Sequence, residues 1–183
     1  MFKKKINGHI DNNTSSPGNL LRSSTEAEIL DILKKGSGVI YLGFPECPWC
    51  AKAVPVLEYA AETAGLREIL YLNISDIRDK LTLDENKKVI TEKEGSAGYY
   101  EMLKILDPIL DEYLLKTNTG EIINTGEKRI LAPTVLFVKN GELVAYHIGT
   151  VDSHKNAYER LNEEQIEELN KIYSDNITKI LQK

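Results

Sequence analysis

A short apolar run that leads into two closely spaced cysteines constrains this chain more than any other feature. Residues 39–44 are apolar with β-branched and aromatic members, a composition typical of a buried strand. A Cys-Pro-Trp-Cys segment follows at 47–50, and apolar residues then recur at helical spacing until Gly65. The sequence therefore predicts that the cysteines lie where a strand gives way to a helix, with Cys47 at the start of that helix.

The patterns on either side of this segment predict an α/β fold. A second apolar run at 69–74 predicts a strand parallel to the first, because a helix connects the two. Two alternating runs flank Asn140-Gly141, a dipeptide that favours a tight hairpin turn. The other elements that we expect are a helix capped by Thr25 and ended by Gly36, a helix around 99–106, a hairpin at 114–124, strands at 130–138 and 142–148, and a helix at 162–181.

The composition fits one globular domain. The chain has 183 residues, of which 42% are hydrophobic and 28% charged. Residues 1–19 have loop composition and are expected to form a flexible lead-in to a single domain at 20–183. The stretch at about 76–128 is only partly periodic and is expected to be an insertion, with its acidic part at 76–94 forming a solvated face.

Charge and hydropathy narrow the classes of partner. With 23 basic and 28 acidic residues the net charge is −5, which argues against non-specific binding of nucleic acid or anionic membranes. The chain contains no run of about 18 apolar residues, so no membrane-spanning helix is predicted. No apolar segment follows Lys3, Lys4 and Lys5, so we expect no secretory signal and a cytoplasmic protein. The alternative is an extracytoplasmic protein from which a leader or anchor has been removed.

The spacing of the cysteines favours redox chemistry. The positive end of a helix stabilises a thiolate, so Cys47 is expected to be the nucleophile and the more exposed of the two. Pro48 suits the first helical turn, where its missing N–H costs nothing. Cys50 is expected to be buried and to resolve a mixed disulfide with Cys47. The pair would then switch reversibly between dithiol and disulfide, without a bound cofactor.

Other interpretations of the same residues are open. A zinc site would need two further ligands, and the only histidines, His9, His147 and His154, are not spaced as a pair. A purely structural disulfide at this spacing closes too small a loop to stabilise much. His147 is expected to have a surface or cross-strand role, and His154 to be solvated in a polar turn. Trp49 is expected to be exposed beside Cys47, as a docking contact or a lid.

Several segments together resemble the thioredoxin superfamily. They are the strand and active-site segment 39–50, Pro55 in the following helix, the Ala-Pro-Thr segment and hairpin turn at 132–142, and Gly149 after the last strand. This resemblance implies a thioredoxin fold, which is a central mixed β-sheet flanked by helices, with the insertion between the second parallel strand and the cis-proline strand. The insertion and the residues at 150–154 also loosely resemble thioredoxin-like proteins of the bacteriocin transport accessory type from Gram-positive bacteria.

The resemblance also implies roles for individual residues. Pro133 would follow a cis peptide bond, and Ala132 would offer its backbone to an extended substrate. Pro48 and Trp49 would complete the substrate-binding surface. Without the resemblance, Pro133 would be interpreted as a trans proline at the entry or edge of a strand.

Three positions depart from the family pattern and are candidates for tuning the redox pair. Tyr41 stands where thioredoxins have a buried acid, and Tyr71 stands where they carry the lysine paired with that acid. Glu46 replaces the tryptophan that usually precedes the first cysteine, and a carboxylate there opposes thiolate formation. The usual proton relay is therefore absent, with Tyr41 or a water molecule in its place.

These observations together predict a thiol–disulfide oxidoreductase. Its substrates would be protein disulfides, and its electron donor a protein of the thioredoxin-reductase type. In a reducing cytosol it would act as a disulfide reductase. Two other functions stay open: a binding or accessory module that docks a partner through Trp49, Ala132 and Pro133, and an extracytoplasmic disulfide oxidase or isomerase.

Overall fold

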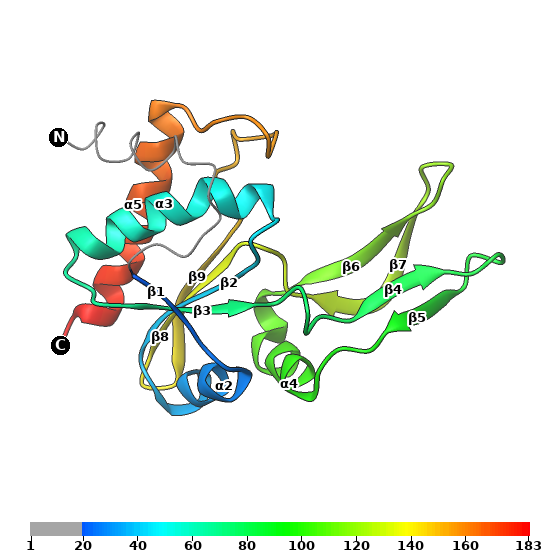
Figure 1. Cartoon of the computed structure of the whole chain (residues 1–183), viewed down its shortest axis with the longest axis horizontal. Helices are drawn as coiled ribbons and strands as arrows, with labels where there is room; N and C mark the ends of the chain where they lie inside the picture. Colours follow the sequence, from blue (N-terminus) through cyan, green and yellow to red (C-terminus); the bar gives the residue numbers. More distant parts are fainter. Residues whose placement is uncertain (1–19) are drawn as a thin grey trace. The chain divides into compact units, whose positions relative to one another are not determined.

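The computed structural model describes residues 20–183, so the lead-in predicted for 1–19 lies outside the described residues. The chain divides into two compact units (Figure 1). The first comprises the residues up to Asn73 together with Ala132–Lys183, and the second comprises Ile74–Leu131. The second unit begins and ends within a few residues of the stretch expected to be an insertion. The description as one domain carrying an insertion stays a prediction.

The first unit is built on a five-stranded mixed sheet with the strand order β1-β3-β2-β8-β9. Strands β1 and β2 both pair in parallel with β3, whereas β8 pairs antiparallel with β2 and β9 antiparallel with β8. The parallel pairing of β2 with β3 confirms the prediction from the two apolar runs, whereas β1 was not predicted. The strands are β1 (Leu21–Ser23), β2 (Gly38–Gly43), β3 (Ile69–Asn73), β8 (Thr134–Lys139) and β9 (Glu142–Ile148).

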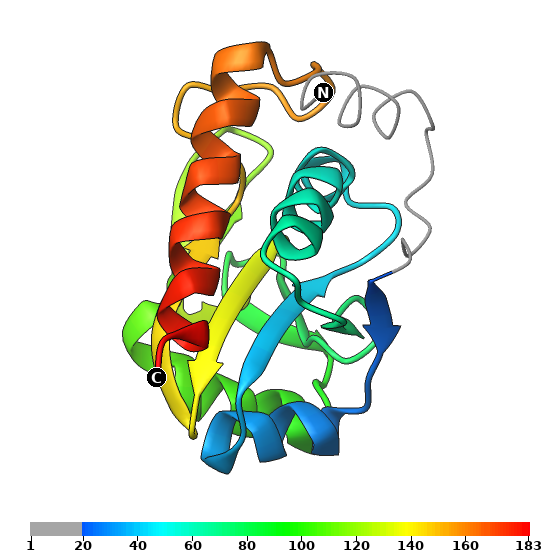
Figure 2. The ribbon, with the colours of Figure 1, turned by 90° about the vertical axis from the view of Figure 1, so that its left-hand side faces the viewer.

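Helices cover both faces of this sheet. Successive side chains of a strand point to opposite faces, so a strand that is apolar throughout has to be covered on both. Val39 and Tyr41 of β2 belong to a core cluster that also includes residues of α3 (Pro48–Thr63) and α5 (Glu163–Leu181). Ile40 and Leu42 point the other way and are fully buried as well. Figures 1 and 2 show α3 and α5 side by side on one face and α2 (Glu26–Lys35) on the other. Burial on both faces explains why β2 is apolar throughout.

Local signals set the ends of these elements. The hydroxyl of Thr25 accepts a hydrogen bond of 3.2 Å from the backbone N–H of Glu28, which caps α2 as predicted. Asn162 caps α5 in the same way, through its bond of 2.9 Å from the N–H of Gln165. Asn140 and Gly141 have φ angles of 52° and 77°, which confirms the tight turn between β8 and β9.

The second unit contains two β-hairpins and a helix. The helix α4 (Ala97–Leu106) is the one expected around 99–106, and it buries Tyr99, Met102 and Leu106. The hairpin expected at 114–124 is formed by β6 and β7. The remaining elements are the hairpin of β4 (Lys80–Leu83) and β5 (Val89–Lys93), the 3-10 helix η1 (Asp107–Ile109), and the strands β6 (Asp111–Lys116) and β7 (Ile122–Arg129).

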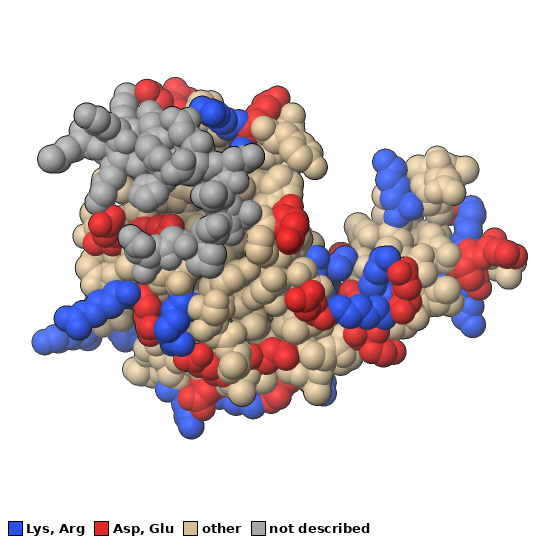
Figure 3. All heavy atoms as spheres, viewed as in Figure 1, with Lys and Arg blue, Asp and Glu red and all other residues tan. Residues whose placement is uncertain are grey.

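The hairpin of β4 and β5 was not predicted, because charged residues dominate it. An ion pair of 2.6 Å joins Lys80 to Glu92 across this hairpin, and another of 2.6 Å joins Lys87 to Glu121 of the neighbouring hairpin. Figure 3 shows acidic and basic side chains interspersed over this part of the molecule. The residues of β5 are mostly exposed, which agrees with the solvated face expected at 76–94.

The mixed α/β architecture confirms the predicted fold class at this level. A central mixed sheet flanked by helices is compatible with the thioredoxin fold that the resemblance implies. None of the helices within residues 20–183 is both long enough and apolar enough to span a membrane.

Candidate active site

Cys47 and Cys50 lie at the amino-terminal end of α3, directly after the central strand β2. Cys47 is the N-cap residue of the helix, and its Sγ accepts a hydrogen bond of 3.1 Å from the backbone N–H of Cys50. Pro48 occupies the first helical turn, as predicted. The two cysteines form a disulfide, with their Cα atoms 5.2 Å apart. The unpaired N–H groups of a helix start favour negative charge, so this position stabilises a thiolate on Cys47 once the disulfide is reduced.

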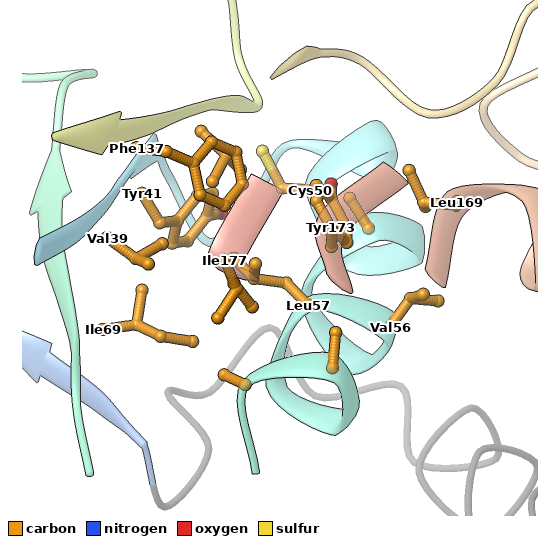
Figure 4. Close-up of a cluster of buried hydrophobic side chains, with 14 of the residues drawn as sticks. Val39, Tyr41, Cys50, Val56, Leu57, Ile69, Phe137, Leu169, Tyr173 and Ile177 are labelled. Carbon is orange, nitrogen blue, oxygen red and sulfur yellow. The ribbon is translucent and has the colours of Figure 1, made fainter. Parts of the chain in front are cut away.

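Both cysteines are buried. Cys50 is 2% exposed, which confirms its expected burial, and Cys47 at 3% is only marginally more exposed. Cys50 belongs to the core cluster, and Figure 4 shows it with Phe137 and Tyr41 on one side and Tyr173 on the other. The apolar residues that follow along α3 continue this cluster and anchor the helix start against the sheet. The redox pair is thus held on a packed element rather than on a loop.

The segment before β8 meets the cysteines from another part of the sequence. The Ala132–Pro133 peptide bond is cis, as the resemblance implies. The carbonyl oxygen of Ala132 lies 3.6 Å from Sγ of Cys47, a distance at which the reduced thiol can donate a hydrogen bond. The carbonyl oxygen of Pro133 accepts a hydrogen bond of 2.9 Å from the N–H of Gly149. Strand β8 starts only at Thr134, so the strand predicted at 130–138 was placed too early at its beginning.

Trp49 and His154 differ from their predicted environments. Trp49 is half-buried rather than exposed, because its ring meets the ring of His154 edge-on at a centroid distance of 5.1 Å. His154 is 5% exposed, so the expectation of a solvated turn is wrong. Both of its ring nitrogens have partners: Nδ1 lies 2.8 Å from Oγ1 of Thr150, and Nε2 lies 3.1 Å from the carbonyl oxygen of Glu159.

His147 lies on β9 opposite Val135 of β8, which agrees with the cross-strand position expected for it. Its Nε2 contacts the carbonyl oxygen of Thr150, and its ring meets that of Tyr173 edge-on at 5.8 Å. Tyr173 is fully buried, and its hydroxyl has no hydrogen-bond partner within residues 20–183. Burial, with a smaller contribution from nearby Tyr41, raises the pKa of Tyr173.

Of the three candidate tuning residues, Tyr41 and Tyr71 lie together in the core and Glu46 is exposed. The two tyrosine rings stack with their centroids 5.1 Å apart. Burial raises the pKa of Tyr41, so its hydroxyl keeps its proton at neutral pH. Tyr41 therefore cannot act as the base that a buried carboxylate would provide.

The arrangement is compatible with dithiol/disulfide exchange, because the first sulfur lies at a helix start and the second is within bonding reach. Within residues 20–183, no group of three or more histidine, cysteine or acidic side chains is arranged to hold a metal ion. Sequence reasoning overlooked Thr150 and Glu159, the partners of His154. The only local signal for these contacts was that a threonine stands four residues before the histidine.

No protein-family model matches the chain, and no curated protein matches it. The geometry of the cysteine pair and of the residues around it is therefore what supports a function.

Proposed function

We propose that this chain is a thiol–disulfide oxidoreductase of the thioredoxin superfamily, with Cys47 as nucleophile and Cys50 as resolving thiol. The observation that carries the proposal is the disulfide at the start of α3, with a cis-proline segment 3.6 Å from its first sulfur. The mixed sheet, with its parallel β2–α3–β3 unit followed by antiparallel β8 and β9, supports the thioredoxin fold. The second unit would then be an insertion between β3 and β8.

In the reductive direction the thiolate of Cys47 attacks one sulfur of a substrate disulfide. The substrate's S–S bond breaks, a mixed disulfide forms on Cys47, and the departing substrate sulfur takes up a proton. The thiol of Cys50 then loses its proton and attacks Sγ of Cys47. This step closes the Cys47–Cys50 disulfide and releases the second substrate thiol. Two electrons and two protons pass from the dithiol to the substrate.

The side chains around the pair suggest how each step is supported. The N–H of Cys50 and the start of α3 stabilise the attacking thiolate. The backbone of Ala132 would bind an extended substrate segment, with Pro133, Pro48 and Trp49 completing the surface. Tyr41 and Tyr71 occupy the positions of the family's proton relay, and Tyr41 remains protonated, so Cys50 would lose its proton to a water molecule instead.

An insulin-reduction assay tests the assignment, with Cys47→Ser and Cys50→Ser as matched controls. We expect the wild type to reduce insulin with dithiothreitol as electron source, and both variants to be inactive. Trapping of a mixed disulfide by Cys50→Ser alone would identify Cys47 as the attacking thiol. Equal activity of the wild type and both variants would refute the proposal and leave a partner-binding module as the alternative.

The reduction potential of the Cys47–Cys50 pair decides the direction of the reaction. A value near about −270 mV would favour a cytoplasmic reductase fed by a thioredoxin-reductase-type donor, and one near about −120 mV an extracytoplasmic oxidase. Because Tyr41, Tyr71 and Glu46 replace the family's usual residues, the value has to be measured on this chain.

A further inference from the structure

Thr150 connects His147 and His154, the two histidines within residues 20–183. Its carbonyl oxygen contacts Nε2 of His147, and its hydroxyl lies 2.8 Å from Nδ1 of His154. Thr150 itself is 5% exposed, so these contacts are shielded from water. They place His154 where its ring meets Trp49 edge-on, at 5.1 Å and with an interplanar angle of 82°.

The partners of His154 define its tautomer. Nε2 lies 3.1 Å from the carbonyl oxygen of Glu159, and a carbonyl oxygen can only accept, so Nε2 carries the hydrogen. In the neutral ring Nδ1 is then an acceptor, and the hydroxyl of Thr150 donates to it. The ring is thus held at two separated atoms, which leaves it one orientation against Trp49.

The segment that holds His154 is also attached to the cis-proline segment. The N–H of Gly149, directly before Thr150, donates a hydrogen bond of 2.9 Å to the carbonyl oxygen of Pro133. In the residue before Pro133, the carbonyl oxygen of Ala132 lies 3.6 Å from Sγ of Cys47. Residues 149–154 therefore link the cis-proline segment, through Gly149, to Trp49, through His154.

We propose that His154 is a positioning residue that, held by Thr150, fixes the indole of Trp49 relative to Ala132 and so sets the width of the surface that receives a protein substrate. This inference rests on the proposed function, because it gives the two sides of that function's docking surface a common support. Thr150 acts through His154, and neither residue takes part in the exchange of sulfur bonds.

Trp49 is the only tryptophan of the chain, so its fluorescence reports directly on the contact. His154→Ala removes the ring from the indole, and Thr150→Val removes the hydroxyl while keeping the shape of the side chain. Ser153→Ala is the matched control, since it removes a hydroxyl of the same loop that binds Gln165 instead of His154. Thermal unfolding establishes that each variant is folded at the assay temperature.

Two measurements are needed. We expect His154→Ala to raise the acrylamide quenching constant of Trp49 by about threefold, and Thr150→Val to raise it by a smaller factor, because the indole loses its edge contact. We also expect His154→Ala to raise KM for insulin by roughly fivefold with kcat changed less than about twofold, since docking is weakened while the sulfur chemistry is intact. Reaction with hydroxyethyl disulfide, a small substrate that needs no docking surface, should keep its rate.

The outcomes separate this inference from the proposed function. If the wild type reduces insulin and His154→Ala leaves both the quenching constant and KM unchanged, His154 does not position Trp49. An equal fall in the rates with insulin and hydroxyethyl disulfide would indicate a merely structural role and would also overturn the inference. If the wild type does not reduce insulin, the proposed function fails, and with it the role of His154 in substrate docking.

Discussion

Gly43 ends strand β2 just before the cysteine segment, and its missing side chain makes room for Tyr41. A methyl group on Gly43 would lie 2.3 Å from Oη of Tyr41 and 2.5 Å from its Cε2 and Cζ atoms. The ring has little freedom to move away, because it is 4% exposed and stacks on Tyr71 at 5.1 Å. Overpacking of a core costs about 1–3 kcal/mol, and alanine in place of a strand glycine recovers roughly 0.5–1 kcal/mol. The clash should therefore cost about 2 kcal/mol, and the net effect of Gly43→Ala should be to lower the free energy of unfolding by about 1 kcal/mol.

A double-mutant cycle tests whether the clash with Tyr41 is the cause. Urea unfolding of the oxidised protein, followed by circular dichroism, would be compared for the wild type, Gly43→Ala, Tyr41→Val and the double variant. Tyr41→Val alone should cost about 3 kcal/mol because it leaves a cavity, but it also provides the space that the new methyl group needs. The two changes should therefore couple by about 2 kcal/mol. Additivity within about 0.5 kcal/mol would refute the reasoning, since it would place the cost of Gly43→Ala elsewhere.

Three further changes test other parts of the structure by urea unfolding. Tyr173→Phe removes a buried hydroxyl that has no hydrogen-bond partner in the described part of the chain, so it should raise the free energy of unfolding by about 1 kcal/mol; a loss of stability would show that the hydroxyl is satisfied after all. Tyr146→Phe, on a ring that is 46% exposed, is the control and should change stability by less than about 0.5 kcal/mol. Burial raises the pKa of Asp79, so the folded state binds its proton more tightly than the unfolded state, and its contribution to stability falls as pH rises above about 4. The stability of the wild type minus that of Asp79→Asn should therefore decrease from acid to neutral pH, and an increase would contradict the burial argument. Gly141→Ala forces a methyl group to within 2.3 Å of the carbonyl oxygen of Lys34 at a φ of 77°, and should cost about 2–3 kcal/mol; a cost below about 1 kcal/mol would show that the turn relaxes.

The elements that sequence reasoning found are those whose signals act over a few residues. Thr25 caps a helix through an N–H three residues away, and Asn140-Gly141 forms a turn through its own φ angles. The buried strands β2 and β3 were found because they are apolar on both faces. In each case the physical cause of the structure is contained in the segment itself.

The hairpin of β4 and β5 shows where that reasoning stops. Period-two alternation marks a strand only when one of its faces is buried. Most of β5 is exposed, and its pairing with β4 is accompanied by the surface ion pair of Lys80 with Glu92. In the sequence, this ion pair cannot be distinguished from two charged residues on a solvated loop. Hydrophobic periodicity reveals buried strands, and charged residues give no comparable signal for an exposed strand.

His154 shows the opposite failure, a polar segment that is buried. Its neighbours at 152–155 are polar, which favours a solvated turn, and a buried imidazole is costly unless its nitrogens have partners. Thr150 and Glu159 supply those partners from its own loop, whereas the ring it packs against, Trp49, comes from the start of α3, far away in the sequence. The sequence contains the hydrogen-bonding groups but not the contact that makes them necessary. The residue that we infer to position Trp49 was therefore hidden by the polar loop that allows it to be buried there.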